Sequence, residues 1–270
     1  MTGLEAALWG ILQGLTEFLP VSSSGHLVLV PWLVYREAPG FSFDVMVHLA
    51  TLLAVLIYFR AEFVMLVRGV LQLIARRRLD TPEARLAWLV IISSIPAVLA
   101  GLLLESVIDR LFGSPPVAAA ALLITGTILF LAERYSGAGA VSQMGPKDAA
   151  LIGLAQAVAL IPGISRSGST IAVGMARGLT RSEAARYAFV MSIPVVLGAA
   201  AMELLDMLTG SGMPGTWGPL AIGMIAAFGS GYLAISALIR HVQRHSLRIF
   251  SVYCWVLGLV ALIVFVVRAV

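Results

Sequence analysis

Long apolar stretches alternate with short polar segments along almost the whole chain. Four stretches are apolar and free of charged residues over about the 20 residues that a membrane-spanning helix needs: 86–104, 111–132, 207–239 and 249–267. The third is longer because it includes a polar loop. Two shorter stretches, 45–59 and 187–202, can also span if they tilt or if their end residues reach toward the membrane surface. The pattern therefore predicts six membrane crossings.

Two further apolar segments, 4–35 and 149–176, are interrupted by polar turns. The first contains Pro20 and the polar run 22–25, and the second contains Pro162 and the polar run 165–168. The apolar pieces that follow these turns, 27–35 and 171–176, cover roughly half a bilayer or less at about 1.5 Å per helical residue. These segments are predicted to be re-entrant helical hairpins, whose exposed backbone must be buried in protein or line a wet cavity.

The basic residues predict how the chain is threaded through the membrane. Most of the 18 lysines and arginines fall into four clusters, at 60–85, 134–147, 177–186 and 240–248. A single alternating threading places all four clusters on one face, which the positive-inside rule identifies as the cytoplasmic face. The opposite loops are then 36–44, 105–115 and 203–217, where acidic residues predominate.

This threading predicts an internal repeat. The halves, about 1–134 and 148–270 within a single membrane domain, each hold one hairpin and three crossings, in opposite orientations. Their breaks also align without a gap, so that Gln13 falls on Gln156 and Ser22 on Ser165. The expected fold class is an all-α polytopic membrane protein with an inverted-topology repeat, six spanning helices and two re-entrant hairpins that meet near the midplane.

The composition excludes several classes of protein. Hydrophobic residues make up 60% of the 270 residues and charged residues 12%, against roughly half and a quarter in ordinary soluble domains. A soluble core cannot bury so much apolar surface, so a soluble enzyme, a disordered chain and a nucleic-acid binder are excluded. The net charge of +4 reflects membrane topology, and the single cysteine, Cys254, allows no intramolecular disulfide.

The first hairpin carries residues suited to a metal and an anion. Gln13 and Glu17 share one helix face, and their amide and carboxylate oxygens suit a hard cation such as Mg²⁺. The turn that follows can expose backbone N–H groups to an anion, and it consists of Ser22, Ser23, Ser24 and Gly25. His26 follows at once and can act as an acid, a base or a nucleophile. The serines can equally serve only as helix caps.

The second hairpin carries donors for phosphate. Arg166 can bind phosphate through two parallel hydrogen bonds. The neighbouring hydroxyls and amides add donors, in a set that comprises Ser165, Ser167, Gly168 and Thr170. Alternatively, Arg166 pairs structurally with an acid such as Glu17. Brought together, the two hairpins would form a phosphate site with a metal ion.

These motifs resemble those of the undecaprenyl-diphosphate phosphatase family, known for bacitracin resistance. The resemblance rests on Gln13 with Glu17, on the serine turn that ends in Gly25-His26, and on the Pro-Gly-x-Ser-Arg-Ser-Gly-x-Thr motif at 162–170. It covers essentially the whole chain. The Gln at position 13, where Glu also occurs, weakens any mechanism that needs two carboxylates there.

The resemblance implies hydrolysis of undecaprenyl diphosphate, the recycling of a lipid carrier for peptidoglycan synthesis, and a multi-pass protein of the bacterial inner membrane with a periplasmic-side active site. It also implies a divalent cation, Mg²⁺ or Ca²⁺, which the residues place at Gln13 and Glu17. The expected catalytic residues are Glu17, Ser23, His26 and Arg166, and the nucleophile stays open between Ser23, His26 and water. The expected partners are the polyprenyl diphosphate substrate and membrane lipids; the oligomeric state, a homodimer included, stays open.

Two other classes of membrane protein share some of these features. A secondary transporter or lipid flippase could also use inverted repeats and broken helices to bind an anion. A type-2 phosphatidic-acid phosphatase is rejected, because residues 167–179 contain neither the histidine nor the aspartate that its motif requires after the arginine.

Overall fold

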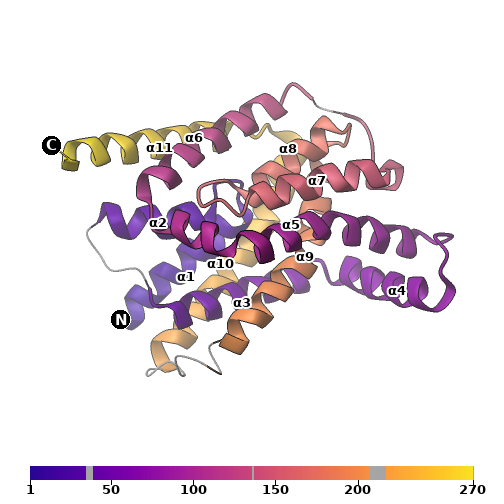
Figure 1. Ribbon diagram of the computed structural model, residues 1–270, viewed down its shortest axis with the longest axis horizontal. Helices are drawn as coiled ribbons and strands as arrows, with labels where there is room; N and C mark the ends of the chain where they lie inside the picture. Colours follow the sequence, from indigo (N-terminus) through magenta and orange to yellow (C-terminus); the bar gives the residue numbers. More distant parts are fainter. Residues whose placement is uncertain (35–38, 136, 207–208, 210–216, 270) are drawn as a thin grey trace.

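The computed structural model describes residues 1–34, 39–135, 137–206, 209 and 217–269, and within them the secondary structure is helical. Figure 1 shows the helices packed as one bundle, with α6 and α11 side by side along one edge and α4 at one end. The helices are α1 (Gly3–Phe18), α2 (Ser23–Leu33), α3 (Phe41–Tyr58), α4 (Arg60–Arg76), α5 (Pro82–Phe112), α6 (Pro115–Ala132), a 3₁₀ turn η1 (Val141–Gln143), α7 (Pro146–Val158), α8 (Arg166–Ala176), α9 (Arg181–Asp206), α10 (Trp217–Arg244) and α11 (Arg248–Ala269).

Several of these helices can cross a membrane. Among the described residues, five are long and apolar enough, namely α5, α6, α9, α10 and α11, and the bent pair α3–α4 makes up to six. Many of their large apolar side chains face outward, as lipid-facing helices require. The protein is therefore a polytopic all-α membrane protein, as predicted. The inverted relation of the halves 1–134 and 148–270, and the depth of each element in the membrane, stay predictions.

The two predicted interruptions are confirmed as helix breaks. In the first half, α1 ends at Phe18 and α2 begins at Ser23; in the second, α7 ends at Val158 and α8 begins at Arg166. Each break precedes a helix of 11 residues, which is about 16 Å long and too short to cross a bilayer. Both short helices fit the predicted re-entrant hairpins, whose path through the membrane stays a prediction.

Two expected loops are wrong in part. The basic segment 60–85 contains α4, which is bent by 87° from α3. Charged residues interrupt the apolar stretch here, so apolar length alone does not predict this helix. Phe63, Leu66 and Val70 nevertheless follow helical spacing and pack on the core. The segment 105–115 is also mostly helical, because α5 continues to Phe112; charged residues end an apolar run without ending a helix. The other two opposite loops, 36–44 and 203–217, include residues 36–38, 207–208 and 210–216, which lie outside the described residues.

Close packing fixes the first hairpin against the second half of the chain. Helix α1 lies on α10, where a Cβ atom at Gly14 would come within 2.1 Å of Ser230 Oγ. Helix α2 is held at its end by Arg268 of α11, whose guanidinium donates to Trp32 O and Leu33 O at 2.8 and 3.0 Å. A cation near the carboxyl end of a helix also complements its dipole. Both helices of the first hairpin are therefore anchored by the second half.

The buried carboxylate of Glu133 contacts the ends of two other helices near the predicted cytoplasmic face. Glu133 follows α6, and its side chain is 4% exposed. It pairs with Arg181 at the start of α9 at 2.5 Å and accepts a hydrogen bond from Leu247 N, before α11, at 2.8 Å. Burial raises the pKa of Glu133, but the hydrogen bonds from Arg181 and Leu247 outweigh it and hold the pKa below its usual value. Glu133 thus stays ionised and fixes the ends of α6, α9 and α11.

Candidate active site

The two helix breaks meet in the interior of the bundle. Ser167 Oγ donates to Leu19 O at 3.2 Å, and Ser22 Oγ donates to Ile164 O at 3.4 Å. A Cβ atom at Gly25 would lie 3.0 Å from Gly163 Cα, so the two turns are in backbone contact. The two hairpins therefore meet, as predicted, while their position near the midplane stays a prediction.

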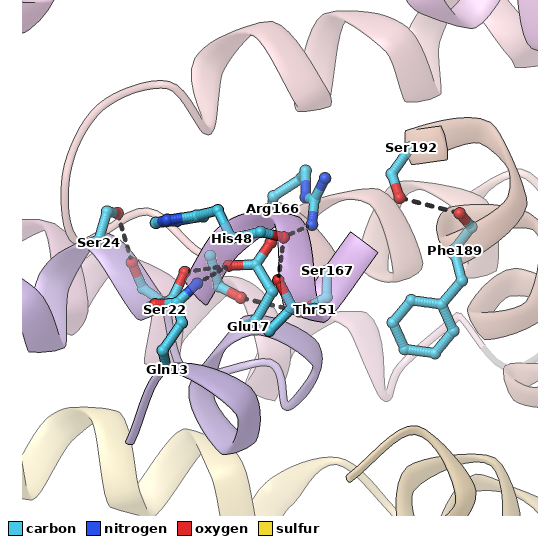
Figure 2. Close-up of polar contacts among 12 residues, drawn as sticks. Gln13, Glu17, Ser22, Ser24, His48, Thr51, Arg166, Ser167, Phe189 and Ser192 are labelled. Atoms are coloured by element: carbon cyan, nitrogen blue, oxygen red, sulfur yellow. Dashed lines mark hydrogen bonds and ion pairs between the residues drawn. The ribbon is translucent and has the colours of Figure 1, made fainter. Parts of the chain in front are cut away.

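Glu17 is the centre of the polar cluster that this contact creates (Figure 2). Its Oε1 accepts from Arg166 Nη2 at 2.5 Å, and its Oε2 accepts from Ser23 Oγ at 2.6 Å and Gln13 Nε2 at 3.1 Å. The side chains of Glu17 and Arg166 remain 10% and 21% exposed. One carboxylate therefore joins both breaks, and the cluster is only partly buried.

The serine turn is a strained helix N-terminus. Ser22 has φ 68° and is the N-cap of α2, where its Oγ accepts from Gly25 N at 3.2 Å. Such a φ is unfavourable for a residue with a side chain, and this kind of strain persists where the surrounding structure imposes it. Ser24 contacts Ser22 Oγ at 3.2 Å. Ser23 and Ser24 are partly exposed, whereas Ser22 is buried. The capping role considered for the serines is thus real for Ser22, and it leaves Ser23 directed at Glu17.

The second turn has the same construction. Ser165 is the N-cap of α8, where its Oγ accepts from Gly168 N at 3.0 Å and contacts Ser167 Oγ at 3.2 Å. Gly163, at φ +94°, has no room for a side chain, because a Cβ atom would lie 2.2 Å from Ala118 O. The Thr170 hydroxyl donates to Arg166 O at 2.8 Å within α8. Both turns thus direct helix N-termini, which favour anions, toward the cluster.

His26 lies beside this cluster, and among the described residues its hydrogen-bond partners are Ser22 and Tyr253 and not Glu17. Its ring is 1% exposed, with Nδ1 at 2.7 Å from Ser22 O and Nε2 at 2.6 Å from Tyr253 OH. The two ring nitrogens are therefore both engaged, whereas the Ser23 hydroxyl lies against a carboxylate.

Sequence reasoning missed two residues around the site. Tyr253 comes from α11, and Thr125 of α6 donates to Gly163 O at 2.8 Å and accepts from Ser165 N at 3.0 Å. Tyr253 and Thr125 stand in apolar helices without a motif, so the sequence carries no signal for them. His48 of α3 is a hydrogen-bonded residue within an apolar helix, because its Nδ1 lies 2.7 Å from Asp44 O.

The site has an oxygen donor set that fits a magnesium ion. Gln13 is fully buried, and its Oε1 has no hydrogen-bond partner among the described residues. This atom and the Glu17 carboxylate lie on one face of α1. No group of three or more His, Cys, Asp or Glu side chains suited to a metal occurs in the described part of the chain. Mg²⁺ often uses only one or two carboxylates together with substrate phosphates, so the pair fits that mode of binding.

The fold and the site together define a polytopic membrane protein with a buried polar centre built from two broken helices, where an arginine and two helix N-termini favour an anion. The sequence model for the family described as bacitracin resistance protein BacA matches residues 6–260, and the chain belongs to this family.

Three relatives are similar to this chain along nearly its whole length. An undecaprenyl-diphosphatase of Desulforudis audaxviator (strain MP104C) is 42% identical over 270 residues, covering 99% of this chain and 100% of the relative. An undecaprenyl-diphosphatase of Thermomicrobium roseum (strain ATCC 27502 / DSM 5159 / P-2) is 44% identical over 96% of this chain and 97% of the relative. One of Methanobrevibacter smithii (strain ATCC 35061 / DSM 861 / OCM 144 / PS) is 43% identical over 95% of each.

Proposed function

We propose that this protein is a phosphatase that hydrolyses undecaprenyl diphosphate to undecaprenyl phosphate and inorganic phosphate. Its family and its undecaprenyl-diphosphatase relatives support this activity. The observation that carries it in the structure is the contact between Glu17, Ser23 and Arg166, which places a carboxylate, a hydroxyl and a guanidinium within one partly exposed cluster. These three groups are the base, nucleophile and charge-stabilising donor that phosphoryl transfer needs.

Ser23 is the nucleophile in the mechanism that we propose. Its Oγ attacks the terminal phosphorus while the proton passes to Glu17 Oε2, 2.6 Å away. The bond between the terminal phosphorus and the bridging oxygen breaks, Glu17 passes its proton to that oxygen, and undecaprenyl phosphate leaves with Glu17 again ionised. Water, deprotonated by Glu17, then attacks the phosphoserine, releases inorganic phosphate and restores Ser23. His26 is less suited to attack, because both of its nitrogens are engaged.

Arg166 stabilises the transferred group. In the cluster it is held by Glu17, so its charge is already positioned where the phosphoryl oxygens would lie. The N-termini of α2 and α8 add backbone donors from the two turns. Electrostatic preorganisation of this kind contributes most when the donors need no rearrangement.

A divalent cation, Mg²⁺ or Ca²⁺, completes the proposed site. Gln13 Oε1 and the Glu17 carboxylate would hold it. Bound there, it would neutralise charge on the diphosphate oxygens.

The polyprenyl tail would lie in the bilayer or between helices. The proposed location is the bacterial inner membrane, with the site opening to the periplasmic side. The product is then the recycled lipid carrier of peptidoglycan synthesis, and its supply accounts for bacitracin resistance.

The activity is tested with purified protein in detergent. We expect inorganic phosphate to be released from undecaprenyl diphosphate, to stop when EDTA is added, and to return with Mg²⁺ or Ca²⁺. Stoichiometric binding of the lipid without phosphate release would contradict the proposal and favour the transporter or flippase, to which broken helices are also suited. Phosphate release that is insensitive to EDTA would contradict the proposed divalent cation but not the proposed phosphatase activity.

The nucleophile is tested by trapping. Acid quenching during turnover is expected to leave phosphate on the peptide that contains Ser23, as mass spectrometry would show, and Ser23→Ala is expected to abolish both this label and turnover. Ser94→Ala is the matched control, because Ser94 is a partly buried helical serine that bonds only to Val90 O of its own helix. Persistent turnover by Ser23→Ala would instead indicate attack by water.

A further inference from the structure

Tyr253 reaches the site from a helix that otherwise faces the lipid. It lies on α11, is 45% exposed, and directs its hydroxyl inward to His26 Nε2 at 2.6 Å. The two rings are nearly parallel, with an angle of 6° between their planes and 5.6 Å between their centroids. The hydroxyl of Tyr253 thus gives a buried imidazole nitrogen a hydrogen-bond partner, and such a nitrogen would be costly to bury without one.

The partners of His26 determine which nitrogen carries its proton. Ser22 O can only accept a hydrogen bond, so His26 Nδ1 must be the donor to it. A neutral imidazole then has a lone pair on Nε2, and the Tyr253 hydroxyl donates to that lone pair. Because the ring is 1% exposed, this pair of hydrogen bonds fixes both its orientation and its tautomer.

His26 in turn supports the strained turn. The carbonyl that it binds belongs to Ser22, the residue with φ 68°. The next residue is Ser23, whose hydroxyl lies 2.6 Å from Glu17. A continuous chain of contacts therefore runs from the Tyr253 hydroxyl, through the imidazole and the Ser22 carbonyl, to the backbone that carries Ser23.

We infer that Tyr253 is a positioning residue of the active site: its hydroxyl locks His26 in the tautomer that holds the Ser22 turn, and the turn aims Ser23 at Glu17. This inference rests on the proposed function, and it assigns His26 a supporting role. Tyr253 acts through His26 and does not contact the reacting atoms. Because Arg268 independently anchors the far end of α2, loss of one hydroxyl leaves the helix in place and affects the geometry of the turn.

The kinetic test compares Tyr253→Phe with Tyr232→Phe. Tyr253→Phe keeps the ring and removes the hydroxyl. We expect kcat for phosphate release to fall roughly tenfold or more with KM nearly unchanged, as for a small displacement of a reacting group. Tyr232 is on α10 and packs its ring against Tyr58, so Tyr232→Phe is expected to keep the kcat of the unmodified protein. An unchanged or higher kcat in Tyr253→Phe would overturn the inference.

A second measurement does not depend on turnover. The chain has four histidines, so protein labelled with ¹⁵N at histidine gives few imidazole signals, and His26→Gln identifies those of His26. We expect Nδ1–H to be the protonated site in the unmodified protein, and a mixture of tautomers in Tyr253→Phe but not in Tyr232→Phe. An identical His26 tautomer in Tyr253→Phe would overturn the inference. If the unmodified protein releases no phosphate, the proposed function fails, and the ¹⁵N spectra still decide whether Tyr253 fixes His26.

Discussion

Arg166→Lys is expected to lower kcat for phosphate release by roughly a hundredfold or more, on the scale of deleting one preorganised donor, while the protein stays folded and inserted. Charge spreads over the equatorial oxygens in a loose phosphoryl-transfer transition state, and a planar guanidinium can meet two of them at once. Lysine keeps the charge and its attraction to Glu17 but loses this two-point contact. The loss should therefore appear in kcat more than in KM.

Measurements of kcat, KM and Tm in detergent separate this role from a structural one. Arg177→Lys is the matched control, because Arg177 directly follows the same helix and pairs with Asp148 outside the cluster. It is expected to keep nearly full activity. If Arg166 served only to pair with Glu17, Arg166→Lys would show a near-normal kcat with a lowered Tm, and the catalytic assignment would be refuted.

Glu17→Gln is expected to reduce kcat by roughly a hundredfold or more, within the range for loss of a general base. The amide keeps the shape of the carboxylate but cannot take the proton of Ser23 or hold a hard cation as strongly. It also leaves Arg166 without its charged partner. Three separate functions of one side chain are lost together.

Gln13→Glu is the informative comparison for Glu17→Gln. Gln13 lies on the same face of α1 as Glu17, and the change replaces its amide oxygen by a carboxylate oxygen. An oxygen ligand is therefore kept, and the loss of activity is expected to be much smaller than in Glu17→Gln. Phosphate release by both variants, titrated with Mg²⁺, measures the difference. Equal and small effects of the two changes would contradict the assignment of base and metal ligand to Glu17.

The helix breaks could be predicted because their causes are local. Pro20 is closely followed by three serines and a glycine, Pro162 by a glycine and a further polar run, and each combination offers the backbone an alternative to the helix. A proline alone is not enough, because α5 continues through Pro96 and α9 through Pro194. The end of α5 and the existence of α4 could not be predicted from apolar length. Phe63, Leu66 and Val70 stabilise α4 by tertiary packing against a core that only the folded chain provides.

The site was predictable to the extent that it lies within the two motifs. Glu17 and Arg166 meet because both motifs end helices at the same place in the bundle, and their residue types indicated complementary charges. Tyr253 and Thr125 could not be inferred, because each acts through one hydroxyl that a distant helix happens to bring within hydrogen-bond distance. A hydroxyl in an apolar helix more often bonds to its own backbone, as Ser94 does.

The ion pair between Glu17 and Arg166 also constrains how the protein is made. The partners are 149 residues apart, so at about 5–20 residues per second the ribosome delivers the arginine roughly 7–30 s after the glutamate. An unpaired carboxylate is costly within the bilayer. We therefore expect the α1–α2 hairpin to remain near the aqueous boundary during synthesis and to reach its final depth only after α8 has been inserted, so that the last half of the chain to be made completes the burial of the first.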